Sequence, residues 1–134
     1  MNDYQLRKEK DFLLPQTVYR QALYAVKDLD RLRRKLYFLK EEITTIKSPD
    51  PSEIHVSGGM VSDATGALAS ELTATEKRII AIESAFLYIP EKYREGIEDK
   101  LVYDVPYDDC HCINTWKKWQ QVYLYYVAMN LGIL

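Results

Sequence analysis

The chain has 134 residues, of which 47% are hydrophobic and 28% are charged, and its formal net charge at pH 7 is -2. This size fits one domain with one hydrophobic core, and the balance of apolar and charged residues excludes a disordered chain. The negative net charge argues against a protein that coats nucleic acid without sequence preference, so any contact with DNA must rest on local basic patches.

The sequence contains no apolar segment typical of a signal peptide near its N-terminus, and no later stretch approaches the length of a transmembrane helix. We therefore expect a cytoplasmic protein that does not contact a membrane. Cys110 and Cys112 are separated by a single residue. Because such close neighbours seldom form a structural disulfide, they do not indicate an oxidising compartment.

In the N-terminal region, residues 1–47, apolar residues recur at spacings that alternate between four and three. They are Val18, Ala22, Ala25, Leu29, Leu32, Leu36, Leu39, Ile43 and Ile46. This is the heptad spacing of a coiled-coil seam. Pro15 precedes the seam and the two prolines in residues 48–51 cannot continue a helix, so we expect one long helix over about 16–47.

This long helix is expected either to form a homo-oligomer or to fold back on the next helix, and its length favours self-association. Residues 17–46 carry seven basic and four acidic side chains, a net charge of +3. Such a charge distribution favours a solvated helix face over a contact with nucleic acid.

Residues 48–66 are rich in Pro, Ser, Gly and Asp and have no sustained periodicity. They predict a linker or long loop. His55 lies in this segment without a second metal-ligating residue at a useful spacing. We interpret His55 as a solvated loop residue rather than a metal ligand.

The C-terminal region, residues 67–134, returns to helical spacing and contains three further expected helices. An apolar stripe predicts the first over 67–89, and Pro90 both ends it and suits the start of the second, Glu91 to about Tyr103. The third covers 113–131 and ends at Gly132, with Asn114 or a residue just before it as the cap. No segment shows convincing strand alternation, so the predicted fold class is all-α.

The last of these helices separates into two faces when it is projected at 100° per residue. One face is apolar and aromatic, with Trp116, Trp119, Tyr123, Tyr126 and Val127. The other is polar, with Asn114, Lys117, Lys118, Gln121 and Tyr125. Recognition helices present such side chains from their N-terminal end, because Asn and Gln can bond adenine edges while Lys bonds guanine edges or phosphate. The spacing alone is equally typical of an outward helix face.

The sequence also resembles the RinA/ArpU family of phage transcriptional activators, over most of the chain and most closely over 57–134. The resemblance is carried by three stretches, which are SGGMVSDATG, EKRIIAIESAFLYIPEKYREGI and NTWKKWQQVYLYYVAMNLGIL. Residues 82–94 are similar to the start of sigma-factor region four, where a helix ends at a Leu-Pro-like step before a helix-turn-helix.

The resemblance implies a phage or prophage regulator of late genes that binds DNA and contacts RNA polymerase. It also implies that the second helix of a helix-turn-helix begins near Thr115. The candidate DNA-binding residues are therefore Asn114, Thr115, Lys117, Lys118 and Gln121.

Two features depart from the family pattern. Residues 107–112 are short and acidic, where a helix-turn-helix needs a supporting helix across the DNA backbone. Gln120 and Gln121 stand where a further basic residue would anchor phosphate, so a monomer should bind DNA only modestly.

No catalytic arrangement can be identified in the sequence, and we expect neither an enzyme nor a cofactor. Asp108, Asp109, Cys110, His111 and Cys112 form the one cluster with metal-ligating side chains. Adjacent residues cannot all point at one ion without a strained loop, and no distant pair supplies the other ligands, so we interpret the cysteines as structural or incidental.

Two other functions remain open at this point. The chain could be a non-enzymatic adaptor with a coiled-coil helix, or a small DNA-recognition subunit of phage packaging machinery. Only DNA binding through lysines should weaken steeply with added salt, and a ring-shaped oligomer would favour packaging.

Overall fold

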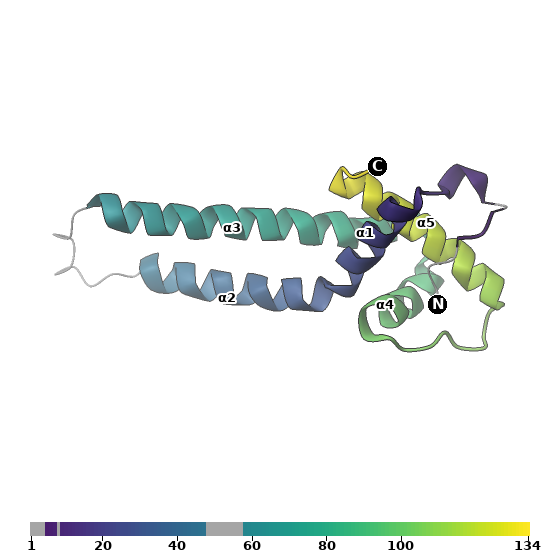
Figure 1. Ribbon diagram of the computed structural model, residues 1–134. Helices are drawn as coiled ribbons and strands as arrows, with labels where there is room; N and C mark the ends of the chain where they lie inside the picture. The colour runs from purple at the N-terminus through teal and green to yellow at the C-terminus, as the bar shows by residue number, and fades with distance from the viewer. Residues whose placement is uncertain (1–4, 8, 48–57) are drawn as a thin grey trace. The chain divides into compact units, whose positions relative to one another are not determined.

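The computed structural model describes residues 5–7, 9–47 and 58–134, and these residues contain helices and no strand (Figure 1). The all-α prediction is therefore confirmed for this part of the chain. In chain order the elements are η1 (Lys10–Phe12), α1 (Gln16–Lys27), α2 (Leu29–Lys47), α3 (Gly58–Ser84), η3 (Ala85–Tyr88), α4 (Glu91–Tyr103) and α5 (Ile113–Leu131). None of the described helices is long and apolar enough to cross a membrane.

The single helix expected over 16–47 is interrupted, so that prediction is wrong in one respect. Helix α1 ends at Lys27, and Asp28 adopts φ -88° and ψ 0° before α2 begins at Leu29. The Asp28 N–H bonds to both the Tyr24 and the Ala25 carbonyl oxygens, at 3.1 and 3.3 Å. A donor shared between two carbonyls in this way is common where a helix tightens and stops.

The linker expected over 48–66 is also partly wrong, because α3 begins at Gly58. Residues 48–57, including His55, lie outside the described part of the chain. The two glycines that suggested a loop occupy the first turn of α3. From Met60 onward no proline interrupts the segment, so the rest of the former linker continues into the expected helix.

The later boundaries agree with the sequence. Helix α3 ends at Ser84, one turn of 3-10 helix follows, and α4 then runs over Glu91–Tyr103 with Pro90 at its N-terminal boundary. Helix α5 covers Ile113–Leu131 as expected. Gly132 follows it at φ +74°, a left-handed conformation that glycine adopts without steric cost.

The chain divides into two compact units, which we call the aromatic unit and the hairpin unit. The aromatic unit comprises Met1–Asp30 and Ile80–Leu134, and the hairpin unit comprises Arg31–Ile79. The domain limits expected from the sequence, at 47 and 66, therefore do not match the packing. Each unit brings together segments on both sides of the expected linker.

The core of the aromatic unit is built from α1, η3, α4 and α5, which contact one another. Its largest fully buried side chains are Tyr19, Tyr123, Leu29, Ile82, Ile97, Leu124, Val26 and Val127. Tyr123 stacks on Phe86 with ring centroids 4.2 Å apart, and its hydroxyl donates a 3.1 Å hydrogen bond to the Ile82 carbonyl. The buried Tyr123 ring thus has a hydrogen-bond acceptor for its hydroxyl group.

The hairpin unit contains most of α2 and α3, which lie side by side in Figure 1. Leu32, Leu39 and Ile43 of the predicted seam are buried within this unit. Ion pairs join the same two helices, from Lys35 to Glu71 at 2.8 Å and from Lys40 to Glu76 at 3.9 Å. These three residues are therefore buried inside one chain, the alternative to the self-association that the length of the helix favoured.

Candidate nucleic-acid interface

Helix α5 carries all five candidate DNA-binding residues, and it begins at Ile113 as expected. Cys112 occupies the N-cap, and no side chain hydrogen-bonds to the first turn from this position. Asn114 is therefore not the cap, and the alternative of a residue just before it is met by Cys112. Backbone N–H groups in the first turn of a helix favour anions, and here no capping side chain at Cys112 competes for them.

Gln121 does not lie on an exposed face, and this part of the projection is wrong. Its side chain is only 3% exposed. Its Oε1 accepts a 2.7 Å hydrogen bond from the Leu6 N–H, while its Nε2 donates to the Leu6 carbonyl at 3.2 Å and lies within 3.4 Å of the Glu9 and Phe12 carbonyls. The amide thus binds the N-terminal segment in the way that a base edge would have been bound.

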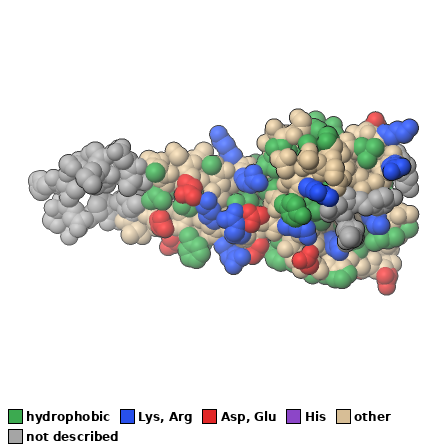
Figure 2. Space-filling model, in the orientation of Figure 1, with side chains coloured by type: hydrophobic (Ala, Val, Ile, Leu, Met, Phe, Trp, Pro, Cys, Tyr) green, Lys and Arg blue, Asp and Glu red, His purple; other side chains and the backbone are tan. Residues whose placement is uncertain are grey.

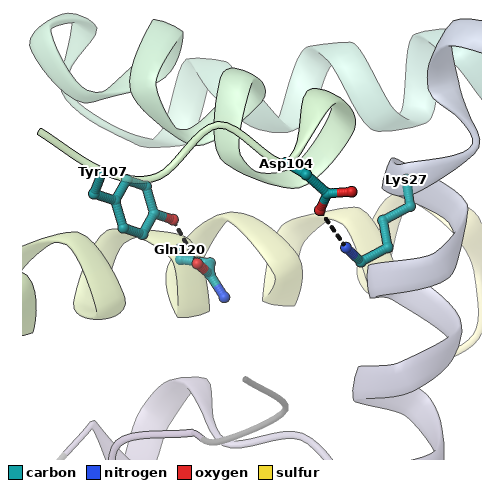
Figure 3. A network of polar contacts seen from close by, with 4 residues as sticks. All are labelled: Lys27, Asp104, Tyr107 and Gln120. Carbon is teal, nitrogen blue, oxygen red and sulfur yellow. Dashed lines mark hydrogen bonds and ion pairs between the residues drawn. The ribbon is translucent and has the colours of Figure 1, made fainter. Parts of the chain in front are cut away.

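Gln120 is also buried, and it joins the loop before α5 to helix α1. The Tyr107 hydroxyl donates to Gln120 Oε1 (Figure 3). Gln120 Nε2 in turn donates to the Tyr19 hydroxyl at 3.4 Å. Burial, with a smaller contribution from Tyr19, raises the pKa of the Tyr107 hydroxyl above its ordinary value. Tyr107 therefore keeps its proton and remains a donor at neutral pH.

The same loop is held at its beginning by an ion pair. Lys27 at the end of α1 approaches Asp104 with Nζ 3.4 Å from Oδ1 (Figure 3). Asp104 itself adopts φ +58° and ψ 28°, the left-handed conformation that ends α4. This ion pair lies at the surface, so the contact that attaches the loop to the core is that of Tyr107 with the buried Gln120.

Trp116 fixes α5 against α4. It is 2% exposed, and Tyr107 stacks on it with ring centroids 4.6 Å apart and an interplanar angle of 7°. Gly96 of α4 allows this close approach, because a Cβ at that position would lie 2.4 Å from the indole ring. Glycine is required here for space rather than for backbone freedom.

The remaining candidates lie at the surface near the start of α5. Asn114 is exposed, and Thr115, Lys117 and Lys118 are half-exposed. Lys118 Nζ lies 4.8 Å from the centre of the Trp119 ring, a cation-π distance. Trp119 is half-exposed and not buried in the core, contrary to the projection.

The carboxylates of Asp108 and Asp109 precede this surface in the loop. Asp108 Oδ1 accepts a 3.0 Å hydrogen bond from the Cys110 N–H, so that side chain orders its own turn. The loop from Asp104 to Cys112 contains nine residues and no helix. This is longer than the 3–4-residue turn that joins the helices of a standard helix-turn-helix, and the segment 107–112 does not supply a supporting helix.

The Cys-His-Cys cluster shows no metal-binding geometry. Cys110 and Cys112 are exposed thiols, and His111 packs against the Tyr93 and Trp116 rings at centroid distances of 4.8 and 5.5 Å. Among the described residues, no three His, Cys, Asp or Glu side chains come together as a metal site would need. His111 contributes instead to the aromatic packing around Trp116.

Searches with the chain against protein-family models, curated proteins and solved structures returned no match. The resemblance to the RinA/ArpU family is therefore carried by the three quoted stretches alone.

Proposed function

We propose that this chain is a phage or prophage transcriptional regulator of the late-gene activator type, which binds DNA through the first two turns of α5. The observation that carries the proposal is that Asn114, Lys117 and Lys118 lie at the accessible N-terminal part of a helix whose other side is fixed in the aromatic core. The family resemblance supports the same role.

The chemistry of this surface suits a DNA groove. An asparagine can form two hydrogen bonds with an adenine edge, and lysines can bond guanine edges or neutralise phosphates. The buried contacts of Trp116 and of Gln121 hold the helix in place. A rigidly held reading helix loses little conformational entropy on binding. Gln121 is not among the proposed DNA-contacting residues, because it is buried. It acts instead as a positioning residue for α5.

Affinity in one copy should be modest because the surface offers two lysines beside two aspartates. Regulators with this weakness bind as dimers to paired half-sites, which multiplies the contacts. Homo-oligomerisation therefore belongs to the proposal. Contact with RNA polymerase is added by the family resemblance, and a cytoplasmic location by the sequence. The helix-turn-helix itself is proposed only in a loose form, with α4 in the supporting position and the nine-residue loop in place of the tight turn.

Fluorescence anisotropy with duplexes that tile the DNA flanking the encoding gene tests the proposal. The parent chain should select one or a few duplexes, and the double variant Lys117→Ala, Lys118→Ala should bind them at least about tenfold more weakly. A control with the same charge change is Lys10→Ala, Lys77→Ala, because both of these lysines are exposed and lie off α5. The control should bind as the parent does.

Equal binding by the parent and the Lys117, Lys118 variant would remove α5 as the reader. The adaptor interpretation would then be preferred. Selective binding by a ring-shaped assembly would favour the packaging interpretation instead.

Sequence preference separates Asn114 from Gln121. Asn114→Ala should relax selection among the tiled duplexes, since a bidentate base contact contributes roughly 1–3 kcal/mol of discrimination. It should leave the fold intact because the side chain is exposed. Gln121→Ala should change preference only as far as it destabilises the N-terminal segment.

A further inference from the structure

The outer face of α2 carries an exposed aromatic pair. Tyr37 is 60% exposed and Phe38 is 62% exposed. Their rings meet edge to face, with centroids 5.5 Å apart and an interplanar angle of 79°. Exposed adjacent aromatic rings are typical of interface centres and rare on solvated helices, where they would lower solubility.

Charges of opposite sign flank this pair along the same exposed face. Arg31 and Arg34 lie before the rings, and Glu41 and Glu42 lie after them, all exposed. At 100° per residue, Arg34, Phe38 and Glu41 lie within one narrow stripe, opposite the buried stripe that contains Leu32, Leu39 and Ile43. Figure 2 shows acidic side chains toward the left of the hairpin unit and a group of basic side chains further along it.

This arrangement is complementary to itself when one copy is reversed. In an antiparallel pair of α2 helices centred between Tyr37 and Phe38, Arg34 of each copy faces Glu41 of the other. Arg31 and Glu42 lie on one flank of the stripe, and a twofold axis brings them together across the pair. The aromatic rings of both copies meet at the centre. A parallel pair would place like charges together, which is unfavourable.

We propose that the outer face of α2 is a homodimer interface, in which two hairpin units pair antiparallel about the Tyr37–Phe38 rings. A shallow hollow of about 410 Å³ lies beside the rings and is lined by Phe38, Glu41, Glu42 and Thr45. In the dimer, Arg34 of the second copy enters this acidic hollow. Arg31 and Arg34 already make contacts within their own chain. In the dimer each guanidinium group therefore interacts both with its present partner and with a carboxylate of the second copy.

The interface is small. The stripe from Arg31 to Thr45 spans about 22 Å at 1.5 Å per residue. A contact limited to this length of one helix belongs at the weak end of specific interfaces. We therefore expect a dissociation constant in the micromolar range. The dimer does not depend on DNA binding, and its test needs no DNA.

Sedimentation velocity of the full chain from about 1 μM to about 1 mM should show a monomer–dimer equilibrium. Arg34→Glu alone and Glu41→Arg alone should each raise the dissociation constant about tenfold or more, because each places like charges opposite one another twice. The chain with both substitutions should dimerise as the parent does. An equimolar mixture of the two single variants should form heterodimers, since both cross-pairs become attractive.

Arg78→Glu is the matched control, because it reverses one exposed arginine of the hairpin unit on α3 and should leave dimerisation unchanged. Tyr37→Ser with Phe38→Ser should abolish dimerisation while the helical circular dichroism signal is kept. A chain that stays monomeric over the whole range overturns the proposal. So does a dimer that responds equally to Arg34→Glu and Arg78→Glu, or one that the double swap does not restore.

Discussion

The aromatic unit and the hairpin unit are stabilised in different ways, although the described residues of both contain helices and no strand. In the aromatic unit, buried polar groups join segments that are far apart in sequence, such as Leu6 and Gln121. In the hairpin unit, one apolar seam and two ion pairs at the surface hold two helices together. The aromatic unit can therefore hold the proposed reading helix rigidly, whereas the outer face of α2 in the hairpin unit is exposed.

The largest expected effect lies in the aromatic unit. Trp116→Ala should lower the free energy of unfolding by about 3–5 kcal/mol, because it empties a buried site between α4 and α5. Trp116→Phe should cost much less, since the buried indole N–H has no hydrogen-bond partner among the described residues and its loss offsets part of the lost packing. Urea denaturation followed by circular dichroism measures both.

Trp119→Ala is the control for this substitution, because Trp119 is half-exposed. It should change stability by less than about 1 kcal/mol. Equal losses for the two alanine variants would contradict the placement of α5 against α4.

In the hairpin unit, Leu39→Ala should lower stability by about 2–3 kcal/mol, since Leu39 is 6% exposed in the seam. Phe38→Ala, one residue away on the outer face, should change monomer stability by less than about 0.5 kcal/mol. Thermal denaturation at a concentration too low for dimers compares the two. A larger loss for Phe38 would mean that α2 presents its other face to α3.

Gln121→Ala should lower the free energy of unfolding by about 1–3 kcal/mol, because it leaves the buried Leu6 N–H without its acceptor. The effect should be local to the N-terminal segment. Hydrogen exchange should show faster exchange at Leu6, whereas Asn114→Ala should leave that amide protected. Unchanged exchange in both variants would show that Gln121 does not hold the segment.

The smallest effect is expected at Asp104, which ends α4 in a left-handed conformation. Asp104→Ala should be less stable than Asp104→Gly by about 1 kcal/mol, because a Cβ without a polar side chain is disfavoured there. Both variants lose the Lys27 ion pair, so the comparison isolates the backbone. If calorimetry shows that Asp104→Ala is more stable than Asp104→Gly, the left-handed conformation of residue 104 is contradicted.

The comparison of the units also shows what could be predicted from the sequence. Helix α4, helix α5 and Gly132 were predicted because their signals, prolines, glycines and apolar spacing, are local. The seam residues Leu32, Leu39 and Ile43 were predicted to be buried for the same reason. The break at Asp28 was missed, because aspartate is tolerated inside a helix and does not break it as proline does.

The candidate site was predicted less well, because burial there depends on a distant segment. Gln121 and Lys118 look equally polar in a helical projection, yet the N-terminal segment near Leu6 covers only the glutamine. Trp119 was placed in the core for its size, although its ring lies half-exposed under Lys118. No periodicity within α5 could show where residues 5–14 lie.

The central claim is that α5 contacts DNA through its half-exposed lysines, Lys117 and Lys118, and the salt dependence of binding tests it most directly. The slope of log K against log salt should be shallower for the Lys117→Ala, Lys118→Ala variant than for the parent by about 1.8, the contribution of two phosphate contacts. The Lys10→Ala, Lys77→Ala control should keep the parent slope. Identical slopes and affinities for the parent and the Lys117, Lys118 variant would contradict the claim.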